Sequence, residues 1–291
     1  MPRPWKTPSK ILCATDLTPS SDKAVARAIQ LAGEWKASLL LVHIVDDTGL
    51  LTKDFALDVR RAEAQLKQQI ATHPAAAEID AEALVSQGHP AERILAKCDR
   101  LFIDLLVMGT VEKASFRQHL LGSTVDHVLR HALQPVLTVR DRPQAAYRTM
   151  AVATDFSLPS QEALDCALTF FPNAKATVVH TYEETLHGLL ASDRVTGEVA
   201  ERHKIEIRAF AEKSMSEFVA EPRRLRPDLA TALEIGAPEA GIKSYVERHN
   251  PDLIVVGTHG RTGLRRAVIG SVAERLIAIL PRDVLAVRPT D

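Results

Sequence analysis

The chain of 291 residues has little net charge, few cysteines and no long apolar run. Its 36 Lys and Arg residues stand against 37 Asp and Glu residues, and the formal net charge is −1. This balance gives no electrostatic case for nucleic acid or an anionic membrane as a partner. No apolar segment approaches the length of a membrane-spanning helix. The polar, Pro-rich stretch 1–9 has no apolar core, so the sequence predicts no signal peptide.

The three cysteines, Cys13, Cys98 and Cys166, are odd in number and lack the spacing of a metal site or a disulfide framework. We therefore expect a reducing, cytoplasmic location, with the thiols acting as small core residues. His127 and His131 lie four residues apart on an expected helix, a spacing that can bind zinc. No carboxylate or cysteine cluster completes such a site in the sequence. They are read as surface histidines, and no metal site is predicted.

Common catalytic and phosphate-binding motifs are also missing. The sequence has no G-x-x-x-x-G-K-[ST] motif, which argues against a Walker-type phosphate loop. It shows no Ser-His-Asp pattern and no obvious general base, so no catalytic residue is predicted. His43 and His180 lie within apolar strands and are read as hydrogen-bonded core histidines. These absences favour binding over turnover.

What the sequence does contain is an alternation of short apolar strands with amphipathic helices. Strand 38–45 is apolar nearly throughout, as expected for a strand covered on both faces. Such alternation predicts a parallel, doubly wound α/β sheet of the Rossmann-like type, which binds ligands at the carboxyl ends of its strands. In the first half the predicted strands are 11–16, 38–45, 82–86, 105–108 and 136–139.

The same pattern then repeats. A constant shift of 148 residues relates Gly109 to Gly257, Gly122 to Gly270 and Arg140 to Arg288. A constant shift over the last third of each half indicates a duplicated domain. We therefore expect two tandem five-stranded domains, residues 1–143 and 144–291, joined by a linker near 141–148.

The segment 257–271 carries the strongest functional signal. It follows the apolar run 252–256 and precedes the apolar-periodic segment 272–280, which together predict a strand, a glycine-rich loop and a helix start. Glycine lets a ligand approach the backbone closely, and a helix N-terminus attracts an anion. The loop is also basic. A phosphate cradle explains these features, although a flexible loop with a solvated basic face is the plainer alternative.

The spacing of this segment, G-x-x-G, nine residues, G-S, resembles the ATP-binding signature of the universal stress protein family. The resemblance covers almost the whole chain. It implies that Asp155 contacts the adenine and ribose end, that Thr181 lines the adenine pocket, and that the glycine loop wraps the ribose and phosphates. A simple helix-capping role for Asp155 is the alternative. The implied ATP-binding residues are Ala153, Thr154, Asp155, Thr181, Val256, Gly257, His259, Gly260, Arg261, Gly270, Ser271 and Val272.

The first half departs from this signature, because Glu112 stands where the second glycine is expected. Its carboxylate would lie near the phosphates, and two unit charges about 4 Å apart repel by about 4 kcal/mol at an effective dielectric of about 20. Weak or no ATP binding is predicted there, unless Glu112 points to solvent or binds a divalent cation. The residues of this degenerate site are Asp16, Ile44, Met108, Gly109, Glu112, Gly122 and Ser123.

The resemblance implies a cytoplasmic nucleotide-dependent regulator of a stress response. Its expected ligand is ATP, or AMP or ADP, with Mg²⁺ as the expected companion ion. A slow ATPase and a nucleotide-free scaffold that binds other proteins are the alternatives. The family often pairs domains through the last strand, so 136–139 and 284–287 are expected to pair, in a homodimer or within the chain as a pseudo-dimer. The sequence identifies no protein partner.

Overall fold

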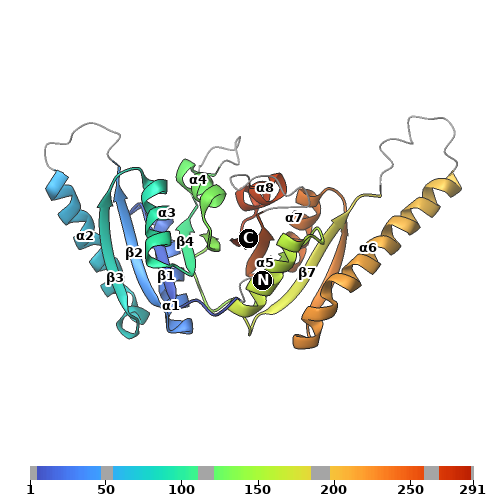
Figure 1. Ribbon diagram of the computed structural model, residues 1–291, viewed down its shortest axis with the longest axis horizontal. Helices are drawn as coiled ribbons and strands as arrows, with labels where there is room; N and C mark the ends of the chain where they lie inside the picture. The colour runs from blue at the N-terminus through green and yellow to red at the C-terminus, as the bar shows by residue number, and fades with distance from the viewer. Residues whose placement is uncertain (1–4, 47–54, 111–120, 185–196, 259–268, 290–291) are drawn as a thin grey trace.

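The computed structural model describes residues 5–46, 55–110, 121–184, 197–258 and 269–289. Its ten strands form one sheet in the order β3-β2-β1-β4-β5-β10-β9-β6-β7-β8. The strands pair in parallel within each half, and the two halves meet where β5 and β10 pair antiparallel. The expected fold of two tandem, doubly wound parallel domains is confirmed, and the two five-stranded sheets join into one (Figure 1).

Strands and helices alternate along each half as the apolar pattern predicts. The first half contains β1 (Lys10–Ala14), α1 (Pro19–Trp35), β2 (Ser38–Val45), α2 (Phe55–Thr72), a 3₁₀ turn (Pro74–Glu78), β3 (Ala81–Gln87), α3 (Pro90–Leu101), β4 (Leu105–Gly109), α4 (Ser123–His131) and β5 (Val136–Val139). The second half contains β6 (Thr149–Ala153), α5 (Leu158–Phe170), β7 (Lys175–Tyr182), α6 (Gly197–Leu225), β8 (Ala230–Ile235), α7 (Pro238–His249), β9 (Leu253–Gly257), α8 (Ser271–Ile279) and β10 (Asp283–Val287).

Local sequence explains where several helices begin and end. Pro19, Pro90 and Pro238 each begin a helix, where the missing N–H costs nothing and the fixed φ suits the first turn. Helices α1 and α3 end at Lys36 and Phe102, which adopt the left-handed conformation that closes a helix. These boundaries begin α1, α3 and α7 on the carboxyl side of the strands that precede them.

The sheet is covered on both faces, and each core runs through both halves. One face packs against α1, α2, α5 and α6, and the other against α3, α4, α7 and α8. Both faces bury apolar side chains, so the strands lack strict alternation of apolar and polar residues. Figure 1 shows α2 and α6 at opposite ends of the sheet, with α4 and α8 neighbouring over its middle.

The two predicted last strands pair within this chain, which is one of the two alternatives left open by the sequence. The antiparallel register sets Val284 opposite Thr138 and Ala286 opposite Val136. The Thr138 hydroxyl also donates a hydrogen bond to the Val284 carbonyl at 3.2 Å. An edge strand left unpaired would be open to association, and each half here covers the other's edge.

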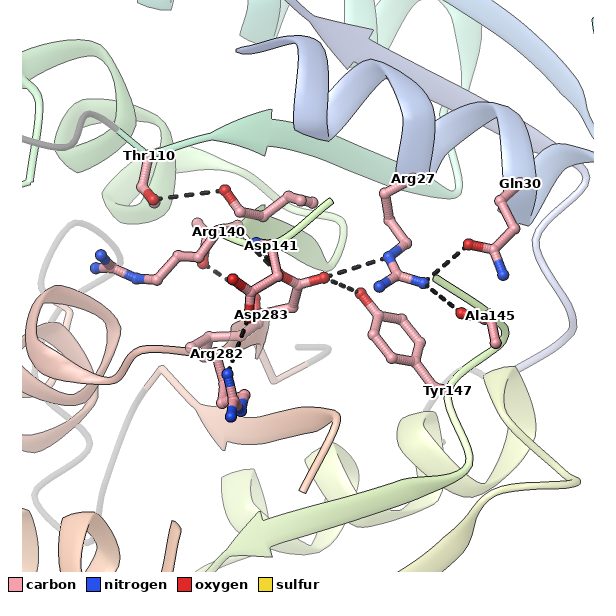
Figure 2. Close-up of polar contacts among 12 residues, drawn as sticks. Arg27, Gln30, Thr110, Arg140, Asp141, Ala145, Tyr147, Arg282 and Asp283 are labelled. Atoms are coloured by element: carbon pink, nitrogen blue, oxygen red, sulfur yellow. Dashed lines mark hydrogen bonds and ion pairs between the residues drawn. The ribbon is translucent and has the colours of Figure 1, made fainter. Parts of the chain in front are cut away.

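A buried polar cluster joins the halves beside this pairing (Figure 2). Asp283, at the start of β10, accepts hydrogen bonds from Arg27 of α1 at 3.3 Å and from the Tyr147 hydroxyl at 2.5 Å. It also accepts from the backbone N–H of Arg140 at 2.8 Å. The Arg27 guanidinium lies 4.0 Å from the centre of the Tyr147 ring. Part of the expected linker is therefore a buried piece of the contact between halves.

All three cysteine thiols are buried, in agreement with their predicted role as core residues. Burial raises the pKa of the Cys98 thiol to about 12, and it raises the pKa values of Cys13 and Cys166 as well. In the described segments of the chain, no helix combines the length and apolar character needed to cross a membrane.

Candidate functional site

Each half contains a cavity at the carboxyl ends of its first and fourth strands, where the strand order reverses. This is the position at which doubly wound sheets bind ligands. The cavity of the second half has a volume of about 270 Å³ and that of the first half about 250 Å³. The second-half cavity is lined by Ala153, Thr154, Asp155, Ser160, His180, Thr181, Pro238, Ile242, Val256, Gly257, Gly270, Ser271, Val272, Ala273 and Leu276.

The loop after β6 holds Asp155 through a local turn. The Asp155 carboxylate accepts hydrogen bonds from the backbone N–H of Ser157 at 3.1 Å and from the Ser157 hydroxyl. Ser157 in turn caps α5 by accepting from the N–H of Ser160 at 3.4 Å. The capping alternative thus describes part of what Asp155 does, and the same residue also lines the cavity.

Asp16 occupies the matching place in the first half. Its carboxylate accepts from the Thr18 N–H at 3.0 Å and from the Thr18 hydroxyl at 2.6 Å. Partial burial raises the pKa of Asp16, but the hydrogen bonds from Thr18 and Ser21 outweigh this effect and leave the pKa lowered. The group is therefore a carboxylate at neutral pH, and it can accept hydrogen bonds from ligand hydroxyls.

Beneath each aspartate lies a buried pair of hydroxyl groups. The Thr154 and Ser160 hydroxyls are 2.8 Å apart, and Thr15 and Ser21 repeat this distance in the first half. Thr154 also accepts from the Phe156 N–H at 2.9 Å. These bonds fix the loop that carries the aspartate, so the cavity has a rigid polar wall. Sequence reading missed Ser160, although the repeated six-residue spacing from threonine to serine was available as a signal.

A side chain would have little room at the glycine that ends each fourth strand. A Cβ atom on Gly257 would lie 3.0 Å from the carbonyl oxygen of Pro159, and one on Gly109 would lie 3.1 Å from Ser21 Cα. The first turn of α5 therefore lies close to Gly257, and the first turn of α1 lies close to Gly109. The glycine-rich sequence predicts instead that a ligand approaches the backbone here.

Helix α8 begins at the rim of the second-half cavity. Gly270 is its N-cap and Ser271 its first residue, and the Gly270 N–H donates to the Thr258 carbonyl at 2.7 Å. Thr258 donates from its own N–H to the carbonyl of Val287 at 2.8 Å, which ties the base of the loop to β10. The first N–H groups of the helix lack intrahelical partners, so an anion placed here would be stabilised.

The histidines in the strands are hydrogen-bonded as predicted. The Nδ1 atom of His43 lies 2.9 Å from the Thr15 carbonyl oxygen, and that of His180 lies 2.8 Å from the Thr154 carbonyl oxygen. His180 additionally lines the second-half cavity and packs on Phe156, with ring centres 4.0 Å apart. The predicted core role of His180 is thus only part of its environment, because its place on the cavity wall was not predicted.

The predicted site residues fall into two groups. Those within the described ranges line their respective cavities: Ala153, Thr154, Asp155, Thr181, Val256, Gly257, Gly270, Ser271 and Val272 in the second half, and Asp16, Ile44, Met108, Gly109, Gly122 and Ser123 in the first. The remaining predicted residues, Glu112, His259, Gly260 and Arg261, lie outside the described residues. The residues predicted from the sequence therefore lie together around one cavity in each half. Their contact with a ligand stays a prediction.

Three histidines of the first half lie close together, one at the start of α3 and two on α4. His127 and His131 stack with ring centres 4.3 Å apart, and His89 lies 6.2 Å from His127. The His131 Nδ1 atom lies 2.8 Å from the His127 carbonyl oxygen, so this nitrogen is already engaged. Across the described part of the chain, no group of three or more His, Cys, Asp or Glu side chains has an arrangement suited to a metal ion.

Comparison with known proteins decides the family. The model of the universal stress protein family matches residues 8–140 and again residues 146–288. The chain belongs to the universal stress protein family. A universal stress protein of Staphylococcus aureus (strain USA300) is 29% identical over 147 residues, which is 49% of this chain and 84% of that protein.

Two solved structures share the arrangement of both halves. One from Archaeoglobus fulgidus is 22% identical with a TM-score of 0.68, covering 96% of this chain and 98% of that one. A Pseudomonas aeruginosa protein described as functionally unknown has the same TM-score at 18% identity, with 97% and 93% covered. At these identities the likeness concerns the fold, and it shows that the tandem arrangement recurs among known structures.

Proposed function

We propose that the second half of this universal stress protein binds an adenine nucleotide, ATP in the first instance, and that the chain acts as a nucleotide-dependent regulator. The observation that carries the proposal is the cavity of about 270 Å³ between the ends of β6 and β9, which opens onto the start of α8. It is supported by the complete glycine signature in the sequence of this half.

The lining is divided in a way that suits a nucleotide. Ile242, Val256 and Leu276 supply an apolar surface for a flat base, and Asp155 supplies a carboxylate for ribose hydroxyls. Gly270 and Ser271 stand at the helix N-terminus, where phosphate charge is favoured. The chain's contribution is thus binding and orientation. Mg²⁺ is expected to accompany the phosphates as their counter-ion.

The first half is proposed to bind ATP more weakly. Its cavity is nearly as large, and its hydroxyl pair and aspartate repeat those of the second half. The geometry of the described residues therefore gives no reason for the two halves to differ in ATP affinity. The proposed difference rests on Glu112 in the sequence, where the second half has Gly260. The 148-residue repeat in the sequence also supports a proposed domain boundary between residues 143 and 144.

Titration calorimetry of ATP and AMP, with Mg²⁺ present, tests the site. We expect one ATP site per chain in the wild type. Asp155→Ala should weaken binding by about 10-fold or more, because a hydrogen bond to a charged group contributes about 1.5–3 kcal/mol. Asp16→Ala is the matched control, since it removes the equivalent carboxylate from the first half and should leave ATP affinity unchanged.

A second variant, Gly260→Glu, copies the first-half residue into the second half and should abolish the ATP site. Two sites in the wild type would contradict the proposed role of Glu112. An absence of binding in the wild type would overturn nucleotide binding and favour a scaffold that acts through protein contacts. Circular dichroism of each variant would show that a lost site does not reflect a lost fold.

A further inference from the structure

Each half of the molecule extends an arginine to a helix of the other half. Arg140 follows β5, and its Nη2 atom donates hydrogen bonds to the carbonyl oxygens of Ile277 at 2.7 Å and Ala278 at 2.8 Å. Those carbonyls lie at the C-terminal end of α8. Arg288 follows β10, and its Nη1 atom donates to the carbonyl oxygens of Arg130 at 3.1 Å and Ala132 at 3.4 Å, at the end of α4.

The antiparallel pairing of β5 and β10 produces this exchange. Arg140 and Arg288 are equivalent residues of the repeat, each directly after the last strand of its half. Because the two strands run in opposite directions, the end of each lies beside the start of the other. Helices α4 and α8 lead into those starts, so each arginine meets the helix end of the opposite half.

A guanidinium at this position stabilises the end of a helix. The last four carbonyl groups of an α-helix lack intrahelical partners, and the helix dipole places partial negative charge there. Arg140 and Arg288 supply both donors and positive charge. The contacts are partly buried, so solvent competes less than it would at an open surface.

The opposite ends of the same helices border the two cavities. Ser271 begins α8 and lines the second-half cavity, and Ser123 begins α4 and lines the first-half cavity. Each helix has only nine residues and is about 14 Å long at 1.5 Å per residue. A shift at the arginine end of so short a helix therefore moves the end that borders the cavity.

A further ion pair joins the two helices directly. Arg130 of α4 contacts Asp126 of its own helix at 2.9 Å and Glu274 of α8 at 3.0 Å. The hydrogen bonds that Arg130 donates to Asp126, together with the charges of Asp126 and Glu274, raise the pKa of Arg130 despite partial burial. These side chains are partly exposed, so the pair adds little stability by itself. It does bring a side chain of α4 into direct contact with α8.

We propose that Arg140 is a positioning residue for the cavity of the other half, since it holds α8 at the end remote from the ligand. Arg288 does the same for the first-half cavity through α4. The identity of the ligand rests on the proposed function, whereas the placement of the helices does not. Each half thus positions a helix that borders the cavity of its neighbour.

The test compares Arg140→Ala with Arg288→Ala in the full chain. The two variants remove equivalent side chains and are matched controls for each other. Hydrogen exchange is measured over 271–279 and 123–131, and Mg²⁺-ATP affinity is measured by calorimetry. Arg140→Ala should speed exchange in α8 and weaken ATP binding by about 3- to 10-fold, the range expected for losing a cation at a helix end.

Arg288→Ala should speed exchange in α4 and leave the ATP affinity of the second half within about two-fold. Arg140→Lys retains a cation and should restore most of the affinity, which a general loss of packing would not allow. Unchanged exchange in α8 of Arg140→Ala would overturn the proposal. So would equal effects of both variants on both helices, or faster exchange in α8 with ATP affinity unchanged.

If the wild type binds no ATP, the proposed function fails separately. The exchange pattern then decides the present proposal alone. A crossed pattern, with each arginine protecting the helix of the other half, supports it. A pattern confined to the half that carries the substitution refutes it.

Discussion

Among single residues, Asp283 shows how one side chain can hold two halves together. It is 1% exposed and accepts from Arg27, from the Tyr147 hydroxyl and from two backbone N–H groups. Burial and the Asp283 charge raise the pKa of Tyr147 well above its ordinary value, so the phenol is a neutral donor. The repeat places Pro135 at the equivalent position of the first half, so this contact occurs once.

We predict that Asp283→Asn lowers the free energy of unfolding by about 3–5 kcal/mol, the cost of leaving one partner of a buried ion pair uncompensated. The uncompensated partner is Arg27, whose side chain is 7% exposed. Urea denaturation followed by circular dichroism measures the change. Lys243→Gln breaks the exposed pair with Glu247 and is the control, with no measurable loss expected. A loss below about 1 kcal/mol for Asp283→Asn would contradict this account.

At the scale of single elements, the end of one strand is constrained by the first turn of the helix that follows the neighbouring strand. Gly257 ends β9 where the first turn of α5 passes over it. Gly33 lies on the exposed side of α1, and a Cβ there would meet Ile79 Cγ2 at an ordinary 3.7 Å. The two glycines therefore differ in whether a side chain can be accommodated.

Opposite effects are expected for alanine at these two positions. Gly257→Ala should destabilise the protein by about 1–3 kcal/mol, because the new Cβ would press against the Pro159 carbonyl. Gly33→Ala should stabilise it by about 0.5–1 kcal/mol, because alanine restricts the unfolded chain and favours helix. Thermal unfolding of both variants measures the difference. Equal shifts of the same sign would refute the packing explanation.

Periodicity and repetition in the sequence were enough to predict the strands and their alternation with helices. Apolar runs predicted the strands because both faces of the sheet are covered, and the constant shift predicted the duplication. The glycine signature led to residues that line one cavity in each half. The hydroxyl pair of Thr154 and Ser160 was missed, because its role depends on how a loop folds back over six residues.

Contacts between the halves could not be predicted from local pattern. Arg27 and Asp283 are 256 positions apart, and their pairing depends on how the two sheets meet. Tyr147 lies in a segment that reads as a linker, yet it is 5% exposed. Arg140 and Arg288 were visible as members of the repeat, but their targets follow from the antiparallel register of β5 and β10.

Across the whole molecule, the apolar packing of the described residues continues from one half into the other. Each of its two apolar cores contains buried residues from both halves, one core on each face of the sheet. Trp35 of α1 packs on Phe170, the last residue of α5, and on Phe171, its C-cap, with ring centres 5.7 and 5.5 Å apart. The halves are repeats in sequence, but they bury apolar surface together.

We therefore predict a single unfolding transition in differential scanning calorimetry, with calorimetric and van't Hoff enthalpies in agreement. Chains of this size with two repeats commonly unfold in steps, so the outcome is informative. Agreement of the two enthalpies at different scan rates would exclude a kinetic artefact. Two resolved transitions would show that each half is stable on its own and that the shared cores contribute little.

Joining β5 to β10 on one chain has a consequence for how the protein responds to its own abundance. When two binding partners are linked on one chain, each meets the other at an effective concentration of about millimolar. This value does not depend on the amount of protein in solution. The pairing seen here is intramolecular, so dilution cannot reverse it. A change in expression level would therefore alter the number of protein molecules, while β5 and β10 would stay paired in each molecule.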